Sequence, residues 1–393
     1  MTVDSLMKEL DDLYPEMVEL RRHFHQYPEL SHQEVETPLT IANYLKNLGI
    51  EVRTNVGGQG VVGVIRGERP GRTAALRADF DALPIQDQKD VPYRSTVPGV
   101  MHACGHDAHT SALLIAAKAL SRHRQHLKGN IVLIHQFGEE VTPGGAKPMI
   151  EDGCLDGVDA IFGTHIWAPM PLGQVGIKPG AIMAAADKFT ITITGRGGHG
   201  GAPHLTADAL LTGASVVSHL QQIVSRRIDP TEAAVISIGT FHSGQAFNVI
   251  AEEAVIEGTV RTFSKQVQET VITEMERVIK GVCDSNGASF KFDYEKGYPP
   301  VINHEKEIGI VRECAKEIVG EEAVIELAPN MIGEDFSYYL ERVPGSFFFT
   351  GAGNQTTEAV YPHHHPKFDI DERAMLNAAK ILVSSALEFL GEK

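Results

Sequence analysis

The order of strand-like and helix-like segments constrains this chain more than any other feature. Residues 1–185 alternate apolar strand-like runs with amphipathic helix-like runs, as in α/β domains whose sheet is covered by helices. From residue 186 to Pro299-Pro300 the order changes to β-α-β-β-α-β, that of a ferredoxin-like unit. The α/β pattern then resumes. We therefore predict an α/β domain of residues 1–185 and 301–393, with an α+β domain of residues 186–300 inserted into it.

Length and charge limit the function classes. A chain of 393 residues is long for one core, and 42% hydrophobic with 22% charged residues is typical of a folded globular protein. No apolar run reaches the roughly 20 residues that span a bilayer. The first residues lack a basic-then-apolar leader pattern, so we expect a cytoplasmic location. The net charge of −16 argues against nucleic acid and anionic membrane as partners, but not against a small anionic substrate.

Four polar clusters follow the carboxyl ends of predicted strands. They are Asp79 with Asp81, Glu139 with Glu140, His165, and the run His363-His364-His365. In open parallel sheets these ends line the crevice where ligands bind. We therefore expect the four clusters to converge on one site.

The run His102 to His109 contains a second kind of ligand. Cys104 and His106 are two residues apart, and Gly105 permits a tight turn before a helix. A thiolate with an imidazole suits zinc, manganese, cobalt or nickel, and a bridging thiolate could hold two such ions. The four cysteines are too scattered for a disulfide framework. The alternative is a buried cysteine beside a histidine that caps the helix.

The adjacent acids Glu139 and Glu140 follow an apolar strand at 131–134. Two carboxylates near a buried strand end are costly unless their charge is compensated, and a metal would compensate it. One could then bind metal while the other takes a proton from water. The alternatives are a solvated acidic turn for this pair, a structural role for His165, and a solvated loop for the three histidines.

Two glycine strings suggest a nicotinamide-dependent oxidoreductase, which we keep only as a distant alternative. Gly58–Gly63 and Gly195–Gly200 both fit G-x-G-x-x-G. A strand follows the first string where a helix should begin, and Pro203 with a lag before the next helix spoils the second. G-x-S-x-G and H-E-x-x-H motifs are absent from the sequence.

Taken together, the motifs resemble the amidohydrolase branch of the M20 metallopeptidases from about Leu20 to the C-terminus. That branch contains N-acyl-amino-acid amidohydrolases, hippurate hydrolases and plant auxin-conjugate hydrolases. The motifs are Arg77-Ala78-Asp79-Phe80-Asp81-Ala82-Leu83-Pro84, His102 to His109, Glu139-Glu140, Gly197-Gly198-His199, Gly333-Glu334-Asp335-Phe336 and His364-His365-Pro366. Asp79 stands where the wider family has a histidine, as in this branch. Phe137-Gly138 stands where the branch usually has Pro-Ala.

The resemblance implies a zinc-peptidase-like catalytic domain with a central mixed sheet flanked by helices. It implies two divalent metal ions bridged by Cys104, with four further ligands: His106, Glu140, His165 and His364. Glu139 would act as general base and then as general acid. Asp81 would support a metal-bound histidine, although a helix or turn cap explains it equally well.

The resemblance also assigns roles to the inserted domain. It implies that this domain mediates assembly into a homodimer or homotetramer, and that His199 stabilises the oxyanion in a partner's active site. Asn248 and Arg261 would bind substrate, because the guanidinium fork of an arginine suits a carboxylate. The alternative for Arg261 is a surface salt bridge.

The expected reaction is hydrolysis of an N-acyl amino acid, a small-molecule substrate, to a carboxylic acid and a free amino acid. A metallo-carboxypeptidase or dipeptidase using the same site is the closest alternative. A non-catalytic scaffold that retains the fold is a further one.

Overall fold

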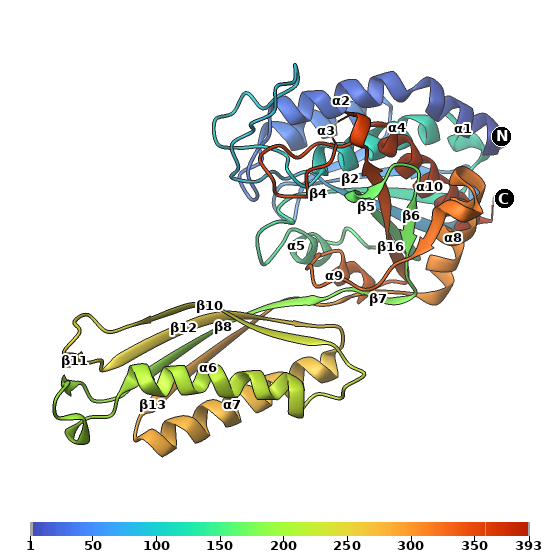
Figure 1. Ribbon diagram of the computed structural model, residues 1–393. Coiled ribbons are helices and arrows are strands. Elements are labelled where there is room, and N and C mark those ends of the chain that lie inside the picture. Colours follow the sequence, from blue (N-terminus) through green and yellow to red (C-terminus); the bar gives the residue numbers. More distant parts are fainter. Residues whose placement is uncertain (1–2, 358, 392–393) are drawn as a thin grey trace. The chain divides into compact units, whose positions relative to one another are not determined.

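The protein, described here by a computed structural model over residues 3–357 and 359–391, divides into two compact units (Figure 1). The larger unit contains the chain up to Ile182, Ile302–Ala328, and the chain from Asp335 onward. The smaller contains Met183–Val301 and Pro329–Glu334. The chain passes between the units at β7 (Gly180–Met183) and β14 (Val301–Asn303), and again on either side of Pro329–Glu334.

The larger unit is built on an eight-stranded sheet of order β1-β2-β4-β3-β5-β16-β6-β15. Its strands are β1 (Glu51–Val56), β2 (Gly60–Arg66), β3 (Arg69–Asp79), β4 (Lys128–Gln136), β5 (Ala160–Pro171), β6 (Val175–Ile177), β15 (Val324–Glu326) and β16 (Gly345–Gly353). β4, β3, β5 and β16 run parallel, whereas β2 and β6 lie antiparallel to β4 and β16. The prediction of a mixed central sheet is confirmed.

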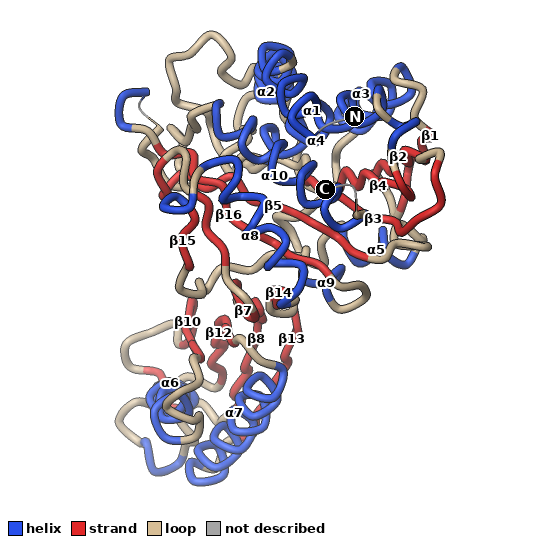
Figure 2. The backbone as a smooth tube through the Cα atoms, turned by 90° about the vertical axis from the view of Figure 1, so that its right-hand side faces the viewer, coloured by secondary structure: helices blue, strands red, loops and turns tan. Residues whose placement is uncertain are grey.

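Helices cover this sheet, as Figures 1 and 2 show. They are α1 (Val3–Asp12), α2 (Tyr14–Gln26), α3 (Glu36–Asn47), α4 (His106–Arg122), α5 (Ala146–Glu151), α8 (Glu305–Val319), α9 (Ser337–Leu340) and α10 (Arg373–Leu390). α4 packs against β3, α2 and α10. Its residues are buried almost throughout because alanine and leucine recur on every face, as expected of a helix enclosed by other elements.

The smaller unit has the predicted ferredoxin-like order. Its elements are β8 (Ala185–Thr194), α6 (Ala209–Arg226), β10 (Ala234–Ser243), β12 (Glu253–Thr262), α7 (Lys265–Asn286) and β13 (Ser289–Tyr298). The antiparallel sheet has the order β10-β12-β8-β13. Alternate residues of β8, among them Phe189, Ile191 and Ile193, join α6 and α7 in one core. The role of 186–300 as a dimerisation domain stays a prediction.

The two glycine strings do not begin helices that could hold a dinucleotide. Residues 58 and 59 lie in the turn between β1 and β2, and residues 60–63 lie in β2, which pairs antiparallel with β1. Residues 195–200 lead into the two-residue strand β9 (Gly198–His199). Among the described residues, no helix combines the length and apolar character needed to cross a bilayer.

Candidate metal centre

The carboxyl ends of β3 and β4 bring the two acid pairs side by side. β3 ends at Asp79, and the backbone N–H of the next residue, Phe80, donates to the carbonyl of Gln136 at 2.9 Å. β4 ends at Gln136, three residues before Glu139. The parallel pairing of these strands therefore places both acid pairs at one edge of the sheet, as the sequence predicted.

Asp81 is buried and its carboxylate joins three segments of the chain. One oxygen, Oδ2, accepts from Ser31 Oγ at 2.6 Å and from the backbone N–H of Glu140 at 3.0 Å. The other, Oδ1, lies 3.0 Å from His106 Nδ1. This contact turns His106 Nε2 away from Asp81, which is the arrangement that a carboxylate behind a ligating histidine requires.

Cys104 and His106 flank the start of α4. Gly105 adopts φ +97°, a left-handed conformation that glycine adopts without strain, and His106 is the first residue of the helix. Cys104 Sγ lies 3.4 Å from His165 Nε2. The tight turn that the sequence predicted at Gly105 therefore places Cys104 beside a ligand from another strand.

The prediction that His165 follows the end of a strand is wrong. β5 continues to Pro171, so that His165 lies inside it. Pairing between β3 and β5 runs to Arg77 opposite Gly163, while β16 pairs with β5 further along, with Phe349 opposite His165. The strand continues because β16 supplies backbone partners after β3 has ended.

His364 approaches from the loop after β16. It adopts φ +64°, and its backbone N–H donates to the carbonyl of Ala103 at 2.8 Å. Its Nε2 lies 3.2 Å from Glu140 Oε1, and its side chain is half exposed. The loop thus carries one imidazole to the acid pair and leaves it open to solvent on one side.

The preceding residue, His363, turns to the opposite side. Its ring stacks on Trp167 with centroids 4.5 Å apart, and its Nε2 accepts the backbone N–H of Ala168 at 3.2 Å. Trp167, the single tryptophan of the chain, also lies 5.5 Å from the ring of His165. Of the three consecutive histidines, the middle one therefore faces the acid pair.

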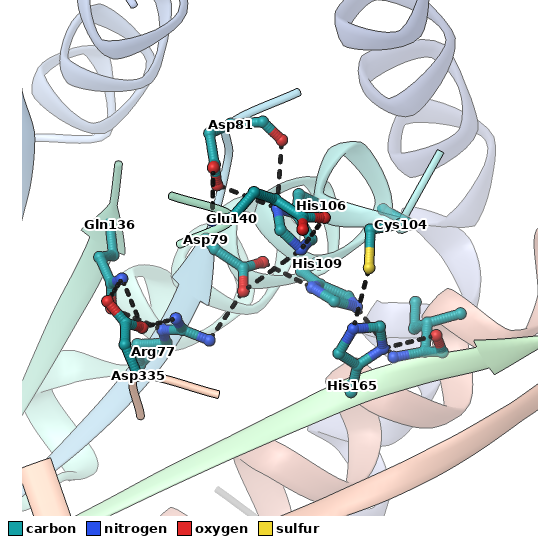
Figure 3. A network of polar contacts seen from close by, with 12 residues as sticks. Arg77, Asp79, Asp81, Cys104, His106, His109, Gln136, Glu140, His165 and Asp335 are labelled. Carbon is teal, nitrogen blue, oxygen red and sulfur yellow. Dashed lines mark hydrogen bonds and ion pairs between the residues drawn. The ribbon is translucent and has the colours of Figure 1, made fainter. Parts of the chain in front are cut away.

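The five predicted ligands come together, several of them drawn in Figure 3. Their candidate ligand atoms form overlapping groups within 4.8 Å: Cys104 with His106 and His165, Cys104 with Glu140 and His364, and His106 with Glu139 and Glu140. Cys104 belongs to two of these groups, as a bridging ligand would. Glu139, the predicted general base, is buried beside them.

The orphaned atoms of the cluster fit a cation. His106 Nε2 and Glu140 Oε1 are buried and make no hydrogen bond among the described residues, and the ring of His364 lies near Glu140 Oε1 as an ion-pair partner. Buried polar atoms normally have one, so each such atom requires an explanation. A thiol, imidazoles and a carboxylate are also the donor set of zinc and related divalent ions.

The pKa shifts of the cluster also favour a bound cation. Burial raises the pKa of the Cys104 thiol well above its usual range, and the carboxylate of Glu140 raises it further. Burial lowers the pKa of His106, but neighbouring carboxylates, Asp79 above all, outweigh it and raise that pKa to about 10. Neighbouring carboxylates contribute to both shifts, and a bound cation would offset their charge, favouring thiolate and neutral imidazole.

A buried arginine behind the site was not assigned a role from sequence. Arg77 lies 2.7 Å from Asp79 and 3.0 Å from Asp335, and its Nε donates to Gln136 Oε1 at 2.9 Å (Figure 3). A signal was available, because Arg77 interrupts an otherwise apolar buried strand. A buried arginine needs such partners.

His109 is a second supporting residue that sequence reasoning missed. Its Nε2 accepts the backbone N–H of Ile166 at 2.8 Å, so its proton is on Nδ1, which lies 2.6 Å from Asp79 Oδ1. His109 thereby ties the end of β3 to the strand that carries His165. Its spacing of three from His106 in the helix was the available signal.

His199, predicted to stabilise the oxyanion, lies in the smaller unit with Asn248 and Arg261, the two predicted substrate-binding residues. His199 in β9 is paired with Val249 in β11 (Val249–Ile250), next to Asn248, and both polar side chains are exposed. Arg261 lies in β12, where its Nε donates to the carbonyl of Met331 at 3.1 Å. β9 and β11 bring two of the three together, and the roles of all three stay predictions.

Comparisons with known proteins agree with this site. The family described as peptidase family M20/M25/M40 matches residues 75–388. Protein YhaA of Bacillus subtilis (strain 168) is 56% identical over 393 residues, 99% of each chain. An N-acyl-L-amino acid amidohydrolase of Geobacillus stearothermophilus is 44% identical over 306 residues, 78% of this chain and 83% of that one. The crystal structure of Bacillus subtilis YXEP, described as a dinuclear metal-binding peptidase from the M20 family, covers 97% of this chain and 99% of its own, with 35% identity and a TM-score of 0.85.

Proposed function

The chain belongs to peptidase family M20/M25/M40, and from that premise we propose that it is a metal-dependent amidohydrolase that cleaves N-acyl amino acids to a carboxylic acid and a free amino acid. One observation carries the proposal: five potential metal ligands from four distant segments meet beside a buried glutamate. An N-acyl-L-amino acid amidohydrolase among the relatives supports the choice of substrate.

Two divalent ions would be held by Cys104, shared between them, and by four further ligands: His106, Glu140, His165 and His364. When bound, such ions polarise a carbonyl group and lower the pKa of water. Zinc, manganese, cobalt and nickel all suit this donor set, and we propose one of them as the native metal. Asp81 would hold His106 through Nδ1, leaving Nε2 for the metal.

Glu139 would carry the proton through the reaction. In our proposal it accepts a proton from the attacking water, whose oxygen bonds to the amide carbon. Glu139 then gives that proton to the leaving nitrogen as the C–N bond breaks. Its burial beside Glu140 and the other predicted ligands supports this role, because a general base must lie within reach of the proton that it takes.

The smaller unit would supply the substrate contacts. We propose that His199 donates to the developing oxyanion and that Asn248 and Arg261 bind the free carboxylate side of the substrate. We also propose that this unit joins subunits into a homodimer or homotetramer. Exposed apolar side chains near His199 and Asn248, including Leu205, Phe247 and Val249, support an interface there.

A screen of N-acyl amino acids, with metal analysis of the same sample, tests this function. We expect hydrolysis that depends on divalent metal and that requires a free carboxylate on the substrate. A metal-loaded protein that cleaves none of these substrates would overturn the proposal. The cytoplasmic location stays a prediction that fractionation of the source cells can check.

A carboxypeptidase or dipeptidase is the second candidate, because one solved relative is described as a peptidase. Both activities need the same metal centre and the same recognition of a carboxylate. Rates on N-acetyl amino acids and on dipeptides with the same C-terminal residue separate them. A higher kcat/KM on the dipeptide would favour the second candidate.

A further inference from the structure

The turn between α2 and α3, residues 29–34, lies against the segment that carries the acid pair. Ser31 Oγ donates to Asp81, the carboxylate behind His106. Glu34 is buried, and its Oε1 accepts the backbone N–H of Gly138 at 2.9 Å. This turn therefore contacts the acid pair's segment, residues 137–141, immediately before the two glutamates.

Gly138 lies close to the turn, and a side chain at this position would be strained. It adopts φ +63°, and a Cβ added there would lie 2.7 Å from Cε1 of His32. His32 Nε2 in turn donates to the carbonyl of Val141 at 3.1 Å. The ring of His32 thus lies over the 137–141 segment, while Glu34 holds its backbone.

We propose that Glu34 is a positioning residue for the hydrolysis: by accepting the Gly138 amide, it fixes the backbone from which Glu139 and Glu140 extend. The inference rests on the roles proposed for those two glutamates. In this role Glu34 acts through the backbone, because its contact is with the amide of Gly138. It was not singled out from the sequence, because nothing local links residue 34 to residue 138.

A carboxyl group can take this position without adding charge to the site. Burial raises the pKa of Glu34 to about 8, and the nearby carboxylate of Asp81 contributes to the shift. The group therefore carries its proton for most of the time at neutral pH. Its Oε2 is buried with no hydrogen-bond partner among the described residues. Glutamine would match the shape, the charge and the acceptor at Oε1.

Three variants test the proposal. Glu34→Leu removes the acceptor, and we expect kcat to fall about 10- to 100-fold, as for other groups that orient a metal site, with KM changed less than about 2-fold. Glu34→Gln keeps the acceptor and should retain kcat within about 2-fold.

Glu29→Leu is the matched control. Glu29 belongs to the same turn, but its carboxylate accepts the backbone N–H groups of residues 35–37, at the start of α3. The Glu29→Leu variant should lower the Tm of the protein as much as Glu34→Leu does, yet leave kcat unchanged. An equal fall in kcat for both variants would overturn the positioning role and leave a general effect on folding.

Hydrogen exchange of the Gly138 amide in metal-free protein gives a readout that does not depend on hydrolysis. The amide should be protected in the wild type, Glu34→Gln and Glu29→Leu, and unprotected in Glu34→Leu. An unprotected Gly138 in the wild type would overturn the inference even if Glu34→Leu failed to fold. A wild type that is protected at Gly138 but cleaves no N-acyl amino acid would instead refute the proposed function and the catalytic role of Glu34 with it, leaving only the contact.

Discussion

The two units hold their candidate functional residues in opposite ways. In the larger unit Asp81, His106 and His165 are at most 5% exposed, and each contacts a side chain or backbone from another segment. In the smaller unit His199 and Asn248 are exposed, on or next to strands of only two residues.

This difference matches the two roles that we propose for the units, metal binding in the larger and substrate contact in the smaller. The predicted metal ligands are orientated by the fold of the larger unit, as a precise site requires. In our proposal, substrate or a second subunit would cover the exposed residues of the smaller unit. Variants of the predicted metal ligands and of the buried residues that support them should therefore change metal content and stability together, whereas variants in the smaller unit should change turnover alone.

Removal of metal is the most severe test of that division. Treatment with a chelator should abolish hydrolysis, since the ions supply the polarisation of the carbonyl, and added zinc or manganese should restore it. The Tm should also fall, because ions that bind only the folded protein stabilise it. Metal analysis and rate on one sample check this. Full activity in metal-free protein would contradict it.

Glu139→Gln should abolish proton transfer while leaving the metal in place. We expect kcat to fall by about 10²- to 10⁴-fold, the usual contribution of a general acid–base group. Kinetics together with metal analysis measure both effects. Glu151→Gln, an exposed glutamate of the same unit, is the control. Unchanged turnover in Glu139→Gln would refute its role.

Arg77→Met should destabilise the larger unit from within. Asp79 and Asp335 would lose their buried counter-charge, a change that typically costs about 3–5 kcal/mol. Urea unfolding followed by metal analysis should show both a lower midpoint and weaker metal binding. Arg66→Met is the matched control, because its ion pair with Glu51 is exposed and is worth about 0–1 kcal/mol.

His199→Ala should act on turnover alone. Loss of one oxyanion donor usually lowers kcat by about 10²- to 10³-fold. Metal content and Tm should stay at their wild-type values, because the exposed ring contributes little to packing. His204→Ala, another exposed histidine of the same unit, should have no effect. A loss of metal in His199→Ala would contradict the expectation that variants in the smaller unit change turnover alone.

As the pH falls, the larger unit should lose stability before the smaller unit does. Burial raises the pKa of Asp369, but Arg21 and Lys89 outweigh it and lower that pKa to about 2, from 3.8. A lowered folded pKa means that the stabilisation is complete above pH 4 and is lost as the pH falls towards 2, by about 2–3 kcal/mol. Hydrogen exchange in peptides from each unit, from pH 5 to 2, measures this. In Asp369→Asn, hydrogen exchange in the larger unit should depend less on pH. Faster exchange that begins in the smaller unit at a higher pH than in the larger unit would contradict the expectation.

The order of elements and the residues that come together at the candidate site could be predicted from the sequence, for identifiable reasons. The β-α-β-β-α-β order was readable because alternation in β8 and helical spacing in α6 and α7 are local patterns. Cys104, His106 and the paired glutamates follow glycine turns or strand ends, which also leave local signals. The motif resemblance then linked these separate segments.

The supporting residues could not be predicted, because their partners are distant along the chain. Arg77 meets Asp335 across 258 positions, and Glu34 meets Gly138 across 104. His165 was placed at a strand end because the apolar run stops at Gly163. The strand continues only through pairing with β16, and no property of residues 164–171 alone reveals that pairing.

The stacking of Trp167 on His363 provides an optical reporter for the larger unit. Trp167 is the chain's single indole, so all tryptophan emission originates 5.5 Å from the ring of His165. Binding of a metal ion by the neighbouring residues should therefore alter the tryptophan emission spectrum of substrate-free protein. The native chain thus permits a titration of cation occupancy without any label.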